Sequence, residues 1–287
     1  MTYWPEGVSW EGGNVTGGRV YVPYYRTLMW SEFPNARRLR RAECSGGIGE
    51  VRVNEGATVN GSTLDREGGV ICCEHGSRSV TRMNHDGSIE TLADRFEGKK
   101  FNSPNDVVVK SDGSIWFTDP AYGIESDYEG FEGAEEIGGQ HVYRIDGGTG
   151  AITRVTDDFT GPNGVAFSLD ETKLYIADSG ATRYPGAPKH IRVFDVTEDN
   201  RLRGGGVFAE CENGVFDGFR FDNKGRIWTS AADGVHCYEA DGTLIGKIFV
   251  PEIVSNLCFG GPKRNRLFIT ATSSVYSVLL ATSGPRI

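Results

Sequence analysis

The sequence lacks any long uninterrupted hydrophobic stretch. No apolar run in its 287 residues approaches the roughly 18 residues that a membrane-spanning helix needs. The opening residues, MTYWPEGVSWEGG, also lack the charged segment and the apolar core of a secretory leader. These absences predict a cytoplasmic protein with no membrane partner.

Positive charge is also scarce. The chain carries 30 Lys and Arg residues against 39 Asp and Glu residues, which gives a formal net charge of −9. Proteins that bind nucleic acids usually present a basic stripe or patch to the phosphate backbone. The charge balance therefore argues against a nucleic-acid partner.

Cysteine and histidine are few and are not spaced as zinc ligands. No two Cys have CxxC spacing, and the five His form no HxxxH pair. Adjacent Cys72 and Cys73 would point to opposite faces of one strand, so no disulfide is expected between them. We expect the cysteines to be reduced, buried side chains in a reducing compartment. They are Cys44, Cys72, Cys73, Cys211, Cys237 and Cys258.

Helical periodicity is nearly absent, whereas 40 Gly and 11 Pro punctuate the whole chain. One unit recurs six times, in which a turn with Asp, Gly or Asn precedes a short β-rich run. The runs lie at 26–33, 67–76, 111–120, 170–180, 223–234 and 263–273. Their spacing of about 40 to 60 residues is typical of four-stranded propeller blades. The sequence therefore predicts an all-β fold, a six-bladed β-propeller, with residues 1–287 in a single domain.

Hairpin patterns follow these runs, and several carry the Asp-Gly turn that strongly indicates a β-hairpin. They occupy 80–93, 141–156, 190–209 and 235–250. The last unit ends at 275–280 and is short of an outer strand. We expect the N-terminal stretch 3–10 to supply that strand and close the ring.

A second regularity lies 11 or 12 residues before the centre of each run, where polar residues recur. The innermost strand of every blade lines the channel of a propeller, so equivalent positions must converge there. Asn and Asp also favour turns for local reasons, but this does not explain five such residues in register. The expected ring is Gly17, Asn60, Asn105, Asn163, Asp217 and Asn256.

The ring offers amide and carboxylate oxygens and little else. Such oxygens suit hard cations such as Ca²⁺ or Mg²⁺ better than zinc. Asp217 is the only charged member of the ring, and a channel carboxylate is a natural acid or base. The ring therefore predicts a small-molecule site in the channel.

Five segments resemble the SMP-30/gluconolactonase/LRE-like family. They are 73–82, 96–124, 157–179, 215–236 and 255–270. The resemblance implies a six-bladed propeller, a divalent cation in the channel, with Ca²⁺ favoured, and commonly the hydrolysis of a lactone. The family holds its metal with a Glu, two Asn and an Asp, and the motifs SPND, PNG and DG place three of these on Asn105, Asn163 and Asp217. The family's acid/base role also falls on Asp217.

The sequence departs from the family at the expected Glu. Where the family's first inner strand reads T-E-G-P-V-Y-V-P, this chain has TGGRVYVP at 16–23, with Gly17 in place of Glu and Arg19 in place of Pro. Loss of one carboxylate should weaken cation binding by orders of magnitude, because each charge pair is worth roughly 4 kcal/mol at 4 Å in a partly polar site. The gap at Gly17 would also admit a larger substrate, and Arg19 shares its strand face. A channel without metal therefore remains open as an alternative.

Other polar residues are candidates for substrate contact. His75, Asp119 and Asp178 follow the second strands of three blades, although each could instead form hydrogen bonds within its own blade. Two segments, 120–140 and 179–190, are candidate binding loops or lids. The candidate substrate-contacting residues are Gly17, Arg19, Asn60, His75, Ser103, Asp119, Tyr122, Asp178 and Asn256.

Three functions fit these observations. The first is a metal-dependent hydrolase that opens a small cyclic ester, with Asp217 as acid or base. The second is a metal-independent cyclase or isomerase of natural-product biosynthesis, in which buried Asp217 is kept protonated. The third is a non-catalytic propeller that binds a ligand. The substrate and the oligomeric state cannot be read from the sequence.

Overall fold

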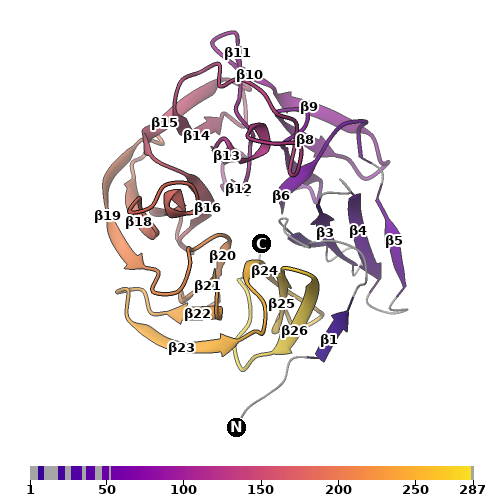
Figure 1. Cartoon of the computed structure of the whole chain (residues 1–287), viewed down its shortest axis with the longest axis vertical. Helices are drawn as coiled ribbons and strands as arrows, with labels where there is room; N and C mark the ends of the chain where they lie inside the picture. Colours follow the sequence, from indigo (N-terminus) through magenta and orange to yellow (C-terminus); the bar gives the residue numbers. More distant parts are fainter. Residues whose placement is uncertain are drawn as a thin grey trace.

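The computed structural model describes residues 6–9, 19–22, 27–33, 37–42, 47–51 and 53–285. Within these residues, six four-stranded antiparallel sheets stand around a common centre (Figure 1). This arrangement confirms the predicted all-β, six-bladed propeller. The centres of the six β-rich runs all fall in the second strand of a blade, as the repeat predicted.

The first three blades run outward from the channel in chain order. Blade 1 contains β2 (Arg19–Val22), β3 (Thr27–Glu32), β4 (Arg37–Ala42) and β5 (Ile48–Glu50). Blade 2 contains β6 (Val59–Leu64), β7 (Val70–Glu74), β8 (Ser79–Met83) and β9 (Ile89–Ala93). Blade 3 contains β12 (Val107–Val109), β13 (Ile115–Asp119), β14 (Gln140–Ile145) and β15 (Ile152–Phe159).

The remaining blades follow the same order, except that the last one borrows its outer strand. Blade 4 contains β16 (Pro162–Phe167), β17 (Lys173–Asp178), β18 (His190–Val196) and β19 (Leu202–Glu210). Blade 5 contains β20 (Phe219–Phe221), β21 (Ile227–Ala231), β22 (Gly234–Tyr238) and β23 (Leu244–Phe249). Blade 6 contains β24 (Val254–Gly260), β25 (Arg266–Ala271), β26 (Ser274–Leu279) and β1 (Glu6–Ser9).

Short elements connect the blades. A two-stranded ribbon, β10 (Arg95–Phe96) and β11 (Lys99–Lys100), lies between blades 2 and 3. The 3-10 helices η1 (Tyr122–Ile124) and η2 (Gly180–Thr182) lie in the two candidate binding loops. Within the described residues, no helix is long and apolar enough to cross a membrane.

The hydrophobic core consists of layers between neighbouring blades. Trp116 of blade 3 packs edge-on against Phe167 of blade 4, with ring centroids 5.4 Å apart. Cys72 packs toward blade 1 and Cys73 toward blade 3, which confirms that they point to opposite faces. The described cysteines are all buried and form no disulfide with one another, whereas Cys44 lies outside the described residues.

The ring is closed by a strand from the beginning of the chain. β1 pairs antiparallel with β26, and Glu6 lies opposite Ser277. This pairing confirms that the N-terminal stretch supplies the missing outer strand. It also covers an edge of β26 that would otherwise expose unpaired backbone groups.

Removal of the closing strand should lower stability without changing the other blades. Deletion of residues 1–9 removes a four-residue pairing, and at about 1 kcal/mol per hydrogen bond the loss is about 2–4 kcal/mol in the free energy of unfolding. Denaturant unfolding measures it, and deletion of residues 1–5, which leaves β1 in place, is the control. Equal stability of the two truncated proteins would contradict the closing role of β1.

Candidate functional site

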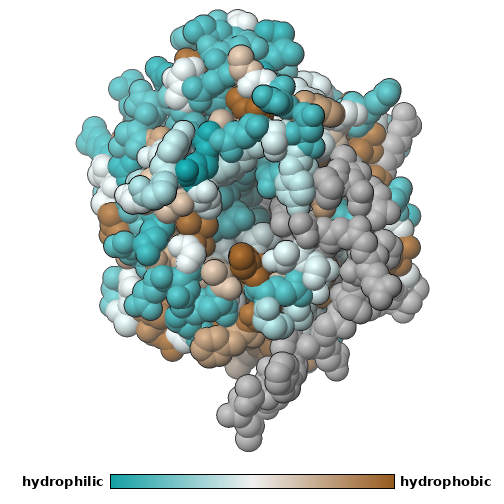
Figure 2. Space-filling view, in the orientation of Figure 1, coloured by the Kyte–Doolittle hydropathy of each residue, from teal (hydrophilic) through white to brown (hydrophobic). Residues whose placement is uncertain are grey.

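Five predicted ring residues lie at the same end of the innermost strands. Asn60, Asn163 and Asn256 lie within β6, β16 and β24, while Asn105 and Asp217 come just before β12 and β20. The six innermost strands contact their neighbours around the channel. Figure 2 shows a hollow at the centre of this face, and its visible floor is mostly hydrophilic. Gly17 lies outside the described residues, and the Arg19 side chain is not described.

Backbone contacts between blades set the height of the ring. The Gly61 N–H donates to the Asn105 carbonyl oxygen at 2.7 Å, and the Gly164 N–H donates to the Asp217 carbonyl oxygen at 3.1 Å. A Cβ atom at Gly164 would lie 2.1 Å from that Asp217 oxygen, so only glycine fits there. The Asn-Gly pairs of the sequence therefore serve two purposes, a polar side chain for the channel and a close approach between blades.

Asp217 is the charged centre of the ring. Its backbone N–H donates to the Ser230 hydroxyl at 2.9 Å, and its carboxylate accepts a hydrogen bond from the Asn163 side chain. Part of its surface remains accessible, but the channel walls enclose it. Burial raises the pKa of Asp217 well above its ordinary value, and the nearby charges of Asp106 and Glu129 raise it further. The proton on this group is therefore held more tightly than on an exposed aspartate.

The neighbouring amides leave oxygen atoms for a ligand. The Asn163 Oδ1 atom is buried and has no hydrogen-bond partner among the described residues. The Asn105 side chain is also buried and makes no hydrogen bond within the described part of the chain. An unsatisfied buried acceptor is costly, so the Asn163 oxygen has spare capacity for a ligand in the channel.

These residues fit a hard divalent cation. Asp217, Asn163 and Asn105 offer oxygen donors only, and the unsatisfied Asn163 oxygen is a ready ligand. The described residues contain no group of three or more His, Cys, Asp or Glu side chains that could hold a metal. A cation held by these three residues would therefore use amide oxygens in addition to the Asp217 carboxylate.

His75 lies against the ring and is completely buried. The Asn60 side-chain amide lies 3.1 Å from His75 Nε2, and the imidazole stacks on Phe33 at 6.3 Å between ring centroids. Because the Asn60 Nδ2 atom is a donor, Nε2 accepts and the proton of the neutral ring sits on Nδ1. Burial lowers the pKa of His75 to about 4, so the imidazole is neutral at physiological pH.

The structure uses Asp119 and Asp178 as anchors for loops. The two Asp119 carboxylate oxygens accept hydrogen bonds from the Asn102 and Ser103 N–H groups, each at 2.9 Å. Asp178 does the same for Thr160 and Gly161 in the next blade. Burial raises the pKa of Asp119 to about 7. The geometry supports the alternative of hydrogen bonding within the blade and gives no support to a substrate contact by either residue.

Ser103 and Asn256 are also engaged locally. The Ser103 hydroxyl donates to the Pro120 carbonyl oxygen at 2.6 Å and accepts from the Gly123 N–H at 2.9 Å. Asn256 Oδ1 accepts from the Leu257 N–H at 2.8 Å. Ser103 is therefore occupied as a loop anchor, while the Asn256 side chain keeps its amide N–H groups for the ring.

The two candidate binding loops meet at this end of the molecule. Tyr122 of the first loop places its hydroxyl 3.4 Å from the Gly161 carbonyl oxygen, and Arg183 of the second loop forms an ion pair with Glu125 of the first. The pKa of Tyr122 is raised, first by burial and then by the charges of Asp217 and Asp178. Tyr122 therefore lies within electrostatic reach of the ring, which suits a substrate contact.

Glu129 is an acidic residue that sequence reasoning missed. The segment 120–140 is a candidate binding loop by sequence, but no repeat register identifies which of its carboxylates turns inward. Glu129 Oε2 lies 3.7 Å from His75 Nδ1, and its charge contributes to the raised pKa of Asp217. Burial raises the pKa of Glu129 itself to about 7.

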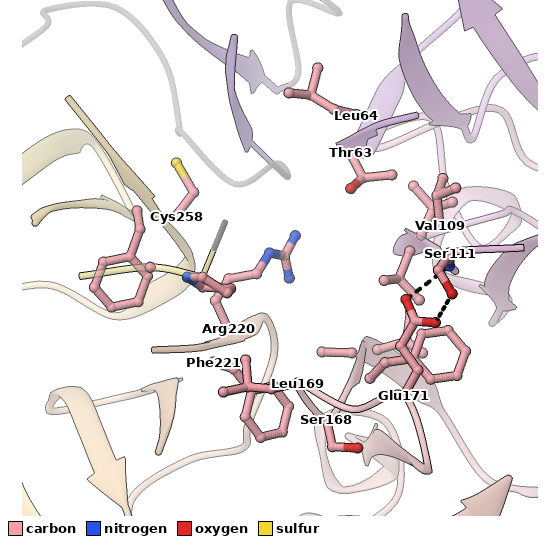
Figure 3. A pocket seen from close by; sticks show the side chains of 18 of the residues that line it. Thr63, Leu64, Val109, Ser111, Ser168, Leu169, Glu171, Arg220, Phe221 and Cys258 are labelled. Atoms are coloured by element: carbon pink, nitrogen blue, oxygen red, sulfur yellow. Dashed lines mark hydrogen bonds between the residues drawn. The ribbon is translucent and has the colours of Figure 1, made fainter. Parts of the chain in front are cut away.

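A separate cavity of about 550 Å³ lies at the opposite mouth of the channel. Its walls come from the far ends of the innermost strands, including Leu64, Val109 and Phe221. Figure 3 shows the Arg220 side chain pointing into this space. Arg220 Nη1 lies 3.6 Å from Asp106 Oδ2, so this cavity ends at a charge pair and does not include the ring.

Known proteins share this architecture. A gluconolactonase from Xanthomonas campestris is 33% identical in sequence with a TM-score of 0.86, over 94% of this chain and 87% of that chain. An X-ray structure of a proposed gluconolactonase is also 33% identical, with a TM-score of 0.91, over 100% of this chain and 96% of that one. These similarities extend over the whole propeller rather than a few motifs.

A curated relative and a family model complete the comparison. A gluconolactonase of Zymomonas mobilis is 30% identical over 240 residues, which cover 78% of this chain and 64% of that protein. The chain thus spans less than two thirds of this relative's length. The model of the SMP-30/Gluconolactonase/LRE-like region matches residues 15–273. The chain therefore belongs to the SMP-30/gluconolactonase/LRE-like family.

Proposed function

We propose that this protein is a lactonase-type hydrolase that opens a small cyclic ester in its channel. The observation that carries the proposal is the enclosed Asp217 carboxylate, held by the Asn163 amide within a ring of oxygen donors. Relatives with the same fold and about one third sequence identity are gluconolactonases, which makes a sugar lactone the first substrate to test. An enclosed carboxyl group with a raised pKa favours a chemical role for this ring over a purely structural one.

The residues of the ring suit the two proton transfers of lactone hydrolysis. Asp217 accepts a proton from water as the water oxygen attacks the acyl carbon, and it returns a proton to the ring oxygen as the acyl C–O bond breaks. The Asn163 amide holds the carboxylate in place through its hydrogen bond. The Asn105 amide, which has no partner among the described residues, is placed to orient the substrate.

A divalent cation fits the same ring and would be held by Asp217, Asn163 and Asn105. When bound, it would polarise the substrate carbonyl as a Lewis acid. We expect its affinity to be weaker than in a site with two carboxylate ligands on the strands, because Gly17 offers no side chain. Ca²⁺ is the favoured ion on the chemistry of the donors.

Chelation is the direct test of this proposal. Exhaustive treatment with EDTA should lower the hydrolysis of glucono-1,5-lactone by about 100-fold or more, and added Ca²⁺ should restore it. Acid release followed by pH-stat measures the rate, with metal content measured on the same sample. Gly17→Glu should tighten Ca²⁺ binding in parallel. Full turnover in metal-free protein would overturn a metal-dependent mechanism.

A metal-independent cyclase or isomerase is the second candidate. The observation that favours it is the raised pKa of Asp217, since burial makes the carboxyl hold its proton more tightly and suits it to act as a general acid. Such an enzyme would be insensitive to EDTA and would release no acid from a lactone. The same pair of measurements therefore separates the two functions, and binding without turnover would indicate a ligand-binding propeller.

A further inference from the structure

The loop between β13 and β14 brings a second carboxylate to the channel. Glu129 lies in the middle of this loop, and most of its side chain is covered, with 28% exposed. Its neighbours Tyr128 and Phe131 are exposed, so the loop turns its glutamate inward while two aromatic side chains face solvent. This orientation removes water from the carboxylate, which costs free energy. A functional role for the carboxylate would offset that cost.

The loop is shaped to allow this approach. A Cβ atom at Gly123 would lie 2.5 Å from the His75 side chain, and a Cβ atom at Gly130 would lie 2.1 Å from the Gly123 carbonyl oxygen. The Phe131 N–H then donates to that same carbonyl at 3.0 Å. Two glycines thus let the loop fold tightly over His75, immediately beside Glu129.

His75 presents a hydrogen-bond donor to this carboxylate. Its Nε2 atom accepts from Asn60, so Nδ1 carries the proton of the neutral ring, and Nδ1 lies 3.7 Å from Glu129 Oε2. Nδ1 is buried and makes no hydrogen bond of ordinary geometry within the described residues, although the Glu129 backbone lies close enough to act on the pKa of the ring. A small inward movement of Glu129 satisfies this donor, and a histidine that orients a carboxylate is a common outer partner of a metal ligand.

We infer that Glu129 supplies the second carboxylate of the channel site, oriented by the Asn60–His75 pair, and provides negative charge to a divalent cation held by Asp217. The inference rests on the proposed function only for the presence of that cation. The loop then provides the charge that the first inner strand lacks at Gly17. One dication then meets two carboxylates, and the net charge of the site is balanced.

Calcium titration by isothermal calorimetry tests this assignment on the full-length, chelator-treated protein. Glu129→Gln should weaken Ca²⁺ binding at least about tenfold, because it removes one unit charge from a partly enclosed site. Glu129→Asp keeps the charge and should recover part of the affinity. Glu132→Gln, in the exposed part of the same loop, is the matched control and should bind as the wild type does.

The Ca²⁺ affinity of the Glu129→Gln protein tests this inference separately from the metal dependence of hydrolysis, which tests the proposed function. The melting temperatures in chelator must agree between the Glu129→Gln protein and the wild type, which excludes misfolding as the cause. Unchanged Ca²⁺ affinity in Glu129→Gln overturns the inference, even if wild-type hydrolysis depends on metal. A wild-type protein that binds no Ca²⁺ up to millimolar concentration overturns it as well.

Discussion

Asp217→Asn is expected to reduce lactone turnover by about 100- to 10,000-fold, the usual contribution of a positioned acid or base. The amide has nearly the same shape as the carboxylate, so packing around Ser230 and Gly164 is preserved. It cannot take a proton from water, however. Initial rates of acid release, measured at saturating and at low substrate, report the loss in kcat and in kcat/KM.

The same variant should be as stable as the wild type or more stable. The folded-state pKa of Asp217 is raised above its unfolded value, so ionisation at neutral pH opposes folding, and this penalty grows as pH rises through the range between the two values. A neutral amide removes the penalty. Asp241→Asn, in an exposed turn of the same blade, is the control for rate and stability. Wild-type turnover in Asp217→Asn would refute the catalytic assignment.

Gly164→Ala is expected to destabilise the propeller by about 3 kcal/mol or more. The added methyl group would lie 2.1 Å from the Asp217 carbonyl oxygen, and that atom belongs to the backbone of the next blade. The two inner strands must separate, which breaks the hydrogen bond between them and is a severe case of overpacking. Because the strain falls between Asn163 and Asp217, turnover should also fall in the protein that still folds.

Gly246→Ala provides the matched comparison. Gly246 lies in the outer strand β23, where an added Cβ atom meets nothing within 4 Å. Its stability should stay within about 0.5 kcal/mol of the wild type. Urea unfolding of both variants measures the difference, and equal midpoints would show that the blades adjust to the methyl group without cost.

The fold and most of the ring were predictable because they repeat. A blade is specified by local turns and alternating strands, and register alone places Asn105, Asn163 and Asp217 at one end of the channel. Closure by β1 followed from the count of strands in the last unit. These inferences needed no knowledge of how loops fold.

The remaining polar residues were harder because they lie outside the repeat. Asp119 and Asp178 follow the second strands as a channel residue would, but their oxygens are taken by backbone N–H groups of the preceding loop. Glu129, by contrast, lies near the ring although nothing in its local sequence distinguishes it from Glu132 or Glu135. Its inward turn depends on Gly123, Gly130 and His75, which come together only when the blades are assembled.

The pairing of β1 with β26 also constrains the order of events during synthesis. Glu6 and its neighbours leave the ribosome long before Ser277 is synthesised, so the closing pairing cannot form until β26 has emerged. Until then the partner edge of β1 is open to other strands. The blades in the middle of the chain can fold as they are synthesised. The pairing of β1 with β26 can form only after β26 has been synthesised. We therefore expect the pairing of β1 with β26 to form last in folding and to limit how soon a nascent chain becomes a closed ring.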